Sequence, residues 1–143
     1  MKTTKYVLLK YNDSSDSHIK ESLMKGIIGV PENAAGRKII RSATPSTPLY
    51  GAIYNCKLKQ VQGIFTSWGK GFEHTKVVFE KVKTDPSEIW PVRVKAAITL
   101  AETTERGVPR ADLVDMGIIV VKGSCQSISK ENWESIRDSI IRV

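Results

Sequence analysis

Two β-rich runs separated by only three residues constrain the fold of this chain more than any other feature. The runs cover residues 49–56 and 60–67, and residues 57–59 connect them. A connection this short joins strands that lie side by side and run antiparallel. The middle of the chain is therefore expected to form a β-hairpin.

The other elements are expected to follow one another in mixed order. Residues 5–11 form a β-rich run that ends at the turn and N-cap residues of 12–17. Further strands are expected at residues 75–82, 89–100 and 117–122, and helices at residues 18–25, 33–40 and from Ser129 onward. This order is not the regular alternation of a parallel α/β fold. It predicts an α+β fold, a curved mixed sheet or small barrel of about six strands with about three helices packed outside.

The ends of the helices carry the clearest local signals. Gly26 is placed to end the helix at 18–25 in the left-handed conformation. Ser129 is placed to cap the last helix, along which Trp133, Ile136 and Ile140 recur at the spacing of one helical face. Trp133 is therefore expected to belong to the core.

The composition fits a single domain with a positive surface. Of the 143 residues, 41% are hydrophobic, which is enough to bury a core without disulfides or metals. Lys and Arg number 22 against 15 Asp and Glu, giving a formal net charge of +7. Positive charge favours polyanionic partners. We therefore expect one domain over residues 1–143, and a polyanion such as nucleic acid is the class of partner that its charge favours.

Other classes of protein lack their signatures in this sequence. No apolar run approaches the roughly 20 residues of a membrane helix, and no signal-peptide pattern is present, so no membrane partner and a cytoplasmic location are expected. Cys56 and Cys125 lie far apart with only His18 and His74 as companions, which is not the spacing of a zinc site or a redox motif. No metal and no cofactor are expected, and a disulfide between the cysteines is left open.

Residues 90–94, Trp-Pro-Val-Arg-Val, carry the strongest indication of function. In an extended strand Trp90 and Val94 share one face, while Arg93 and Lys95 share the other. Such a strand can line a pocket with one face and meet phosphate with the other. The alternative is that Trp90 fills a core and the two cations are solvated.

The same residues are similar to the strand signature of EVE domains, which belong to the PUA-like superfamily. Residues 10–12, Lys-Tyr-Asn, resemble the end of the first strand of the related YTH domains. Residues 26–29 occupy the place of the YTH Gly-Val-Trp-Ser, and residues 61–65 and 122–128 resemble two further YTH stretches. The chain thus resembles an EVE/YTH-type domain over nearly its whole length, which implies a PUA-like fold.

The resemblance implies a non-catalytic reader that flips a modified base out of RNA or DNA, with N6-methyladenine favoured. A flipped base is recognised by hydrogen bonds to its edge combined with flat groups against its faces. Carried over by position, Asn12 hydrogen-bonds the base edge and the Gly29 carbonyl accepts from an exocyclic amine. The base-binding candidates are Tyr11, Asn12, Ile28, Gly29, Trp68, Phe72 and Trp90. The phosphate-binding candidates are Lys10, Arg93, Lys95, Lys122 and Gln126.

The sequence departs from the YTH pattern at the first tryptophan of the aromatic cage. Ile27 or Ile28 stands at that place. Trp68, Phe72 and Trp90 remain as pocket walls, although Trp68 is also consistent with a hydrophobic lid, and surface lysines are often simply solvated. Selectivity for methyladenine therefore depends on these remaining aromatic residues.

Two other functions stay open from the sequence. An enzyme would use Glu73 with His74, but neighbours on a strand point to opposite faces, and no Walker loop or dinucleotide fingerprint is present. No catalytic residues are therefore expected. The second alternative is a small-molecule, nucleoside or protein-interaction module that uses the same pocket. Because some EVE-type and YTH-type domains serve modification-dependent restriction systems, the resemblance also implies a nuclease or ATPase partner.

Overall fold

The computed structural model describes residues 5–11, 26–30, 37–73, 92–101, 106–121 and 125–141. Several expected elements lie outside the described residues, wholly or in part. They are the helix at 18–25, the beginning of the helix at 33–40, the strand at 75–82, the first residues of the strand at 89–100 and the last residue of the strand at 117–122.

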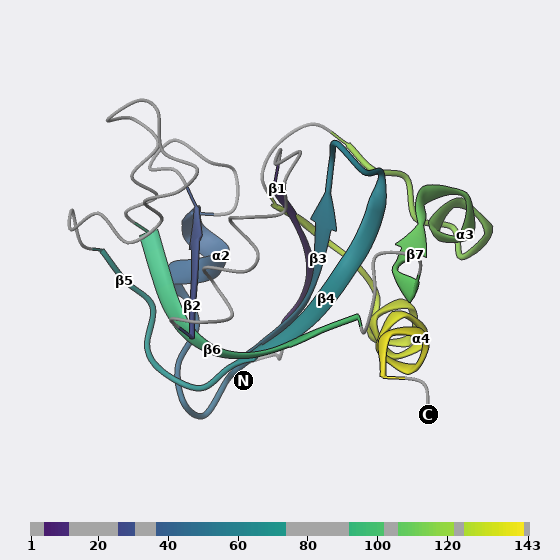
Figure 1. Cartoon of the computed structure of the whole chain (residues 1–143). Helices are drawn as coiled ribbons and strands as arrows, with labels where there is room; N and C mark the ends of the chain where they lie inside the picture. The colour runs from purple at the N-terminus through teal and green to yellow at the C-terminus, as the bar shows by residue number, and fades with distance from the viewer. Residues whose placement is uncertain are drawn as a thin grey trace.

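Eight strands of the described residues form one mixed sheet. They are β1 (Lys5–Tyr11), β2 (Ile27–Val30), β3 (Leu49–Asn55), β4 (Gln60–Ser67), β5 (Phe72–Glu73), β6 (Val92–Leu100), β7 (Val108–Pro109) and β8 (Cys125–Ser127). Neighbours follow the order β2-β6-β4-β3-β1-β8, with β5 beside β6 and β7 beside β4. The pair of β1 and β3 is parallel and the other pairs are antiparallel. Together with the three helices of the described residues, this curled half-barrel confirms the expected fold class (Figure 1).

The predicted hairpin is the best-defined part of the sheet. β3 and β4 pair antiparallel, with Tyr50 opposite Thr66 and Asn55 opposite Gln60. At the turn Lys59 has a φ of 55°, and its N–H donates to the Asn55 carbonyl over 2.8 Å. The connection has four residues, 56–59, one more than expected, and it joins two antiparallel strands as predicted.

Strand β6 explains why the sheet curls. Its second half pairs with β4, from Ser67 opposite Ala96 to Gly63 opposite Leu100. Its first half extends past the end of β4 and pairs with β2 on one side and with β5 on the other. In Figure 1 β6 turns upward at this end, so that β2 and β6 form one wall of the half-barrel and β4, β3 and β1 form the other.

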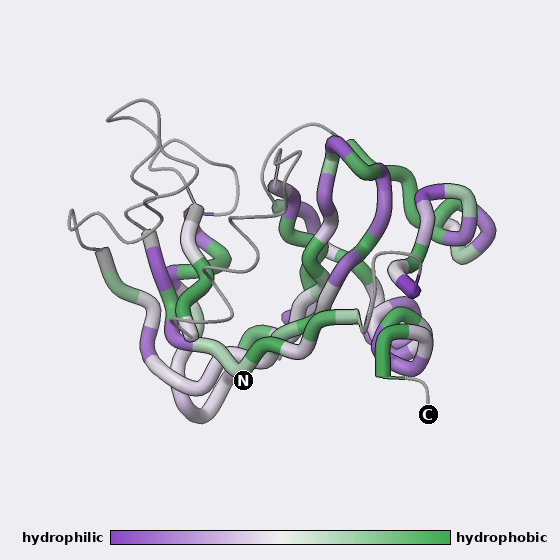
Figure 2. The backbone as a smooth tube through the Cα atoms, viewed as in Figure 1, coloured by the Kyte–Doolittle hydropathy of each residue, from purple (hydrophilic) through white to green (hydrophobic). Residues whose placement is uncertain are grey.

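The two faces of the sheet bury separate cores. The inner face packs against α2 (Arg37–Arg41) through Leu9, Tyr11, Ile28, Ile40, Ile53, Phe65 and Val94. The outer face packs against α3 (Arg110–Asp115) and α4 (Lys130–Ile140) through Leu8, Tyr54, Val61, Ile64, Leu113, Trp133 and Ile136. Figure 2 shows apolar stretches in the strands of both walls and in α4. Side-chain alternation along each strand produces this division.

The C-terminal helix confirms its sequence signals. The Ser129 hydroxyl accepts the N–H of Asn132 over 3.1 Å, as an N-cap should. Trp133 is buried, and its indole N–H donates to the Gly51 carbonyl over 2.8 Å. Gly26 likewise has a φ of 65°, the left-handed conformation predicted for it.

The strand expected at residues 117–122 is wrong for the described residues 117–121, which form no strand. The place beside β1 is taken by β8, in which Gln126 lies opposite Leu8. The Gln126 side chain binds the apolar run instead, by donating to the Ile119 carbonyl over 2.8 Å and accepting from the Val121 N–H over 3.0 Å. Ile119 is 74% exposed, so an apolar run alone does not make a buried strand.

Candidate nucleic-acid interface

Tyr11 and Gly29 meet between the two walls of the half-barrel, at a buried contact that we call the mouth. Tyr11 ends β1, and Gly29 lies in β2 on the opposite wall. The Tyr11 hydroxyl donates to the Gly29 carbonyl over 3.3 Å. Two sequence-predicted base-binding positions, 18 residues apart, are thus brought together.

Below the mouth the inner face is apolar and closed. Tyr11 is 1% exposed, and Ile28 is fully buried in the same core as Val94. Ile28 lies opposite Val94 in the pairing of β2 with β6. Ile28 therefore forms part of the floor under the mouth, while the Tyr11 ring forms its edge.

Strand β6 separates two environments by alternation. Val94 and Ala96 are buried in the inner core, and Lys95 on the other face is exposed. This confirms the predicted division between the Val94 face and the Lys95 face. Trp90 lies outside the described residues, so its place on the inner face stays a prediction.

Arg93 lies on the same face of β6 as Lys95, but Arg93 is buried whereas Lys95 is exposed. Arg93 lies opposite Gly29 on one side and Phe72 on the other, and it is only 2% exposed. Burial lowers the pKa of its guanidinium. Phe72 is half-buried at this point. Both residues therefore lie within the wall of the mouth in the free protein.

Lys10 and Gln126 form a separate polar cluster on the outer face. The Lys10 ammonium donates to the Val121 carbonyl and to the Gln126 side-chain oxygen, each over 2.8 Å. Lys10 is 5% exposed, and burial lowers its pKa. As neighbours on β1, Lys10 and Tyr11 point to opposite faces. The cluster therefore holds residues 119–121 in place beside β8 and stands apart from the mouth.

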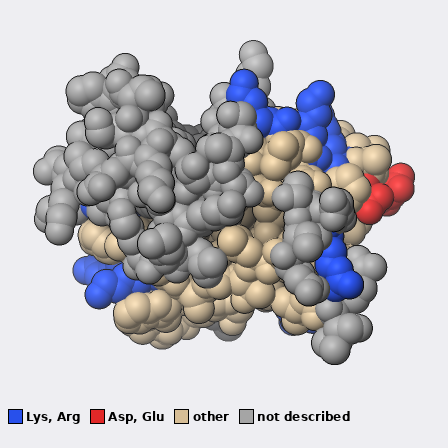
Figure 3. All heavy atoms as spheres, in the orientation of Figure 1, with Lys and Arg blue, Asp and Glu red and all other residues tan. Residues whose placement is uncertain are grey.

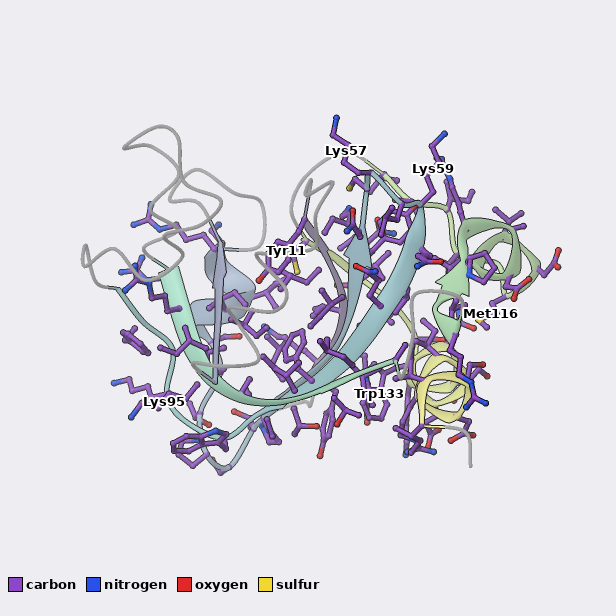
Figure 4. All side chains as sticks on the ribbon, viewed as in Figure 1. Tyr11, Lys57, Lys59, Lys95, Met116 and Trp133 are labelled. Carbon is purple, nitrogen blue, oxygen red and sulfur yellow. The ribbon has the colours of Figure 1, made fainter. Side chains whose placement is uncertain are left out.

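Trp68 and Lys95 form the third group of predicted residues. Trp68 follows the end of β4, and its N–H donates to the Lys95 carbonyl over 3.0 Å. The Lys95 ammonium lies over the indole, 5.3 Å from the ring centroid. Trp68 is 58% exposed. Figure 4 shows Lys95 pointing away from the sheet, on the side opposite to Tyr11.

Charge is divided between the two halves of the described chain. From residue 5 to residue 101, every described charged residue except Glu73 is Lys or Arg. The remaining described acidic residues lie on α3 and α4. They are Asp112, Asp115, Glu131, Glu134 and Asp138. The strand half of the protein is therefore the half suited to a polyanion.

Lys57 and Lys59 are the candidate phosphate contacts that the sequence analysis left out. Both are exposed at the hairpin tip, where the Cys56 N–H donates to the Tyr11 carbonyl over 2.7 Å. Figure 4 shows both lysines at the top of the molecule, at the end of the sheet where Tyr11 lies, and Figure 3 shows Lys and Arg side chains along that upper edge. No sequence motif marks these two lysines. The signal that could have identified them is their position between β3 and β4, at the hairpin tip that lies beside the end of β1.

The described residues offer little for catalysis or metal binding. No group of three or more His, Cys, Asp or Glu side chains among them could hold a metal ion. Cys56 and Cys125 are free thiols, and burial raises the pKa of Cys125 to about 12. None of the helices in the described ranges is long and apolar enough to cross a bilayer. Asn12 and Lys122 lie outside these ranges.

Comparisons with known proteins identify the fold. No family model matches the sequence, and no curated protein matches it. The YTH domain of Zygosaccharomyces rouxii MRB1, solved in complex with N6-methyladenosine RNA, superposes with a TM-score of 0.70 at 15% identity, covering 98% of this chain and 88% of that one. The Pho92 YTH domain, solved with m6A, gives 0.68 at 12% identity, with 96% and 83% covered. Rpa0253 from Rhodopseudomonas palustris gives 0.57 at 14% identity, with 96% and 93% covered. The chain therefore has a YTH-like fold.

Proposed function

We propose that this chain is a non-catalytic nucleic-acid-binding domain that recognises a flipped modified base at the mouth, with N6-methyladenine as the favoured base. The observation that carries the proposal is the hydrogen bond between Tyr11 and Gly29, which joins two predicted base-binding positions. It is supported by the YTH-like fold, because the MRB1 and Pho92 YTH domains were solved with methylated adenosine ligands.

The Gly29 carbonyl is the proposed acceptor for the exocyclic amine of the base. A carbonyl oxygen has two lone pairs, and the Tyr11 hydroxyl occupies one of them through a long contact of 3.3 Å. The second lone pair is the proposed site for the base. In this arrangement Tyr11 positions the carbonyl, and its ring excludes water from one side of the mouth.

Selectivity for the methyl group is proposed to come from residues around this carbonyl. Ile28 contributes apolar floor and is fully buried. Asn12, which follows Tyr11 directly, is the proposed partner for the base edge, and Trp90 is the proposed stacking wall. Stacking on an aromatic ring is worth about 1–3 kcal/mol for each base.

The phosphates next to the flipped base are proposed to contact the exposed lysines of the hairpin tip. Lys57 and Lys59 lie at the same end of the sheet as Tyr11 and form no ion pair within the described residues. Lys122 is proposed as a further contact. Such contacts release counterions, so the logarithm of the affinity should fall linearly with the logarithm of the salt concentration.

An oligonucleotide panel tests the proposal. RNA and DNA strands with and without N6-methyladenine or 5-methylcytosine are titrated against the wild-type chain and against Asn12→Ala and Trp90→Ala. Loss of a buried hydrogen-bond partner in Asn12→Ala, or of a stacked ring in Trp90→Ala, costs about 1–3 kcal/mol. Each variant should therefore lose about 5- to 150-fold in affinity for the methylated strand. Val114→Ala, on the exposed surface of α3, is the control and should bind as the wild type does.

Two outcomes contradict the proposal in different ways. Equal affinity for every modified and plain strand rules out modified-base recognition but leaves general nucleic-acid binding. A free methylated nucleoside that binds nearly as tightly as the strand favours the nucleoside-binding alternative, because the backbone then contributes nothing.

A further inference from the structure

We propose that Trp68 and Lys95 form a second binding site, a stacking platform for single-stranded nucleic acid on the outer face of the half-barrel. The platform is defined here as Trp68, Lys95 and the adjacent Lys70. It requires no modified base and goes beyond recognition at the mouth. Its occupant is an ordinary nucleotide, whose base stacks on the indole while its phosphate meets the lysines.

The exposure of the Trp68 ring is the first observation that supports a stacking site. The Lys95 ammonium covers one face of the ring from 5.3 Å, yet 58% of the residue remains exposed. That exposed area has to come from the opposite ring face and the edges. An open indole face accepts any base, because every base presents a flat π-surface.

The geometry around Trp68 is fixed before a ligand arrives. The Trp68 N–H is bound to the Lys95 carbonyl over 3.0 Å, and the Gly71 N–H donates to the Ala43 carbonyl over 3.0 Å. Gly71 also packs so closely on α2 that an added Cβ would lie 2.2 Å from the Ile40 carbonyl oxygen. The connection from β4 to β5 is therefore held at both ends, which lowers the entropy cost of binding.

Charge favours a nucleic acid over a protein as the occupant. Lys95 lies over the ring, and Lys70 follows Trp68 two residues along the chain. Both lysines are exposed, and neither forms an ion pair within the described residues. Among the described residues, the acidic ones lie on α3 and α4, except for Glu73 in β5. An apolar protein surface would cover the indole but would leave these cations without partners.

The platform and the mouth lie on opposite faces of β6. Lys95 is exposed on the outer face, whereas its neighbours Val94 and Ala96 are buried in the inner core with Tyr11. In Figure 4 Lys95 and Tyr11 point away from one another. A ligand of one nucleoside cannot occupy both sites, so the two can be tested separately.

Unmodified octamers of uridine and of thymidine test the platform, by anisotropy for affinity and by tryptophan fluorescence for stacking. The wild-type chain should bind at least one octamer with quenching. Trp68→Ala should weaken that binding by about 5- to 150-fold, as expected for loss of one stacked base. Trp68→Phe should retain most of the affinity but lose the quenching, because it keeps a ring and removes the indole. Lys95→Gln should reduce the slope of log affinity against log salt by about one.

Val114→Ala is the matched control, because Val114 is also 58% exposed but lies on α3 among acidic residues. Its octamer affinity should equal that of the wild type. Unchanged affinity in Trp68→Ala, or no binding of either octamer by the wild type, overturns the platform whatever happens at the mouth. Titration of Trp68→Ala with free N6-methyladenosine shows whether the substitution affects one site or both. If the variant loses octamer binding but still binds the nucleoside, the two sites are separate. If it loses both, the separation of the two sites is overturned.

Discussion

The mouth and the platform differ in almost every physical respect, although a single strand contributes to both. At the mouth Tyr11 and Ile28 are buried in an apolar core, and the Tyr11 hydroxyl donates to the buried Gly29 carbonyl. At the platform Trp68 and Lys95 are exposed, and the Lys95 ammonium is the cation over the ring. An enclosed polar group discriminates between bases, because an unpaired buried group is costly. An exposed ring with a cation binds any base.

We therefore propose that specificity and general affinity are placed on opposite faces of one sheet. Alternation along β6 makes this possible, since Val94 and Lys95 are adjacent in sequence yet differ completely in exposure. Variants that change one face should therefore leave the other face intact.

Truncating Ile28 should have the largest effect. Ile28 is fully buried, so Ile28→Ala should lower the free energy of unfolding by about 2–5 kcal/mol through the cavity that it leaves. Val114→Ala, on the exposed surface of α3, should change it by less than about 0.5 kcal/mol. Urea denaturation measures both. A small loss for Ile28→Ala would mean that Ile28 faces an open cage rather than the core.

Alkaline pH should destabilise the inner core through Cys125. Burial raises the pKa of this thiol from 9.0 to about 12, so the folded state retains a proton that the unfolded state has lost. The contribution of the protonated thiol to the free energy of unfolding is fully present below pH about 9. It is lost as pH rises toward about 12, which lowers that free energy by up to about 4 kcal/mol. Denaturation across this range should show a steeper decline for the wild type than for Cys125→Ala. Equal declines would contradict the burial of Cys125.

Two glycines of one connection should respond differently to the same substitution. An added Cβ at Gly71 would lie 2.2 Å from the Ile40 carbonyl oxygen, whereas at Gly69 the nearest atom would be 3.6 Å away. Gly71→Ala should therefore cost about 1–3 kcal/mol of stability and disturb the platform. Gly69→Ala, the control, should cost less than about 0.5 kcal/mol. Similar losses in both variants would show that the connection is not held against α2.

Removing the Tyr11 hydroxyl should have the smallest effect on stability. Tyr11→Phe keeps the ring but loses the hydrogen bond to Gly29, at a cost of about 0.5–1.5 kcal/mol. Octamer binding at the platform should be unchanged in this variant. A loss of octamer affinity would show that the two faces are coupled.

The sequence alone predicts the elements whose structure depends on residues close together in the chain. The three-residue connection predicted the hairpin, and Ser129 predicted the start of α4. Alternation along residues 92–100 correctly separated Val94 from Lys95. These signals depend on neighbours in sequence, so a single chain contains them.

Features that depend on distant partners could not be predicted. The apolar residues 117–121 form no strand because β8 pairs with β1 in their place, and Gln126 binds their backbone instead. Lys10 and Arg93 stay predicted phosphate contacts, but the sequence does not predict that the tertiary structure buries both. The meeting of Tyr11 with Gly29 also arises from the curl of the sheet. The base-binding set as a whole stays a prediction, because Asn12 and Trp90 lie outside the described residues.

Chemical-shift mapping on the isotope-labelled chain tests the central claim most directly. Free N6-methyladenosine and an unmodified uridine octamer are titrated in parallel, and the backbone amides and indole N–H groups are followed by nuclear magnetic resonance. The account predicts that the nucleoside shifts the amides of Tyr11 and Gly29, whereas the octamer shifts the indole N–H of Trp68 and the amide of Lys95. If both ligands shift the same residues, or if the nucleoside leaves Gly29 unmoved, the assignment of base recognition to the mouth and strand binding to the platform is contradicted.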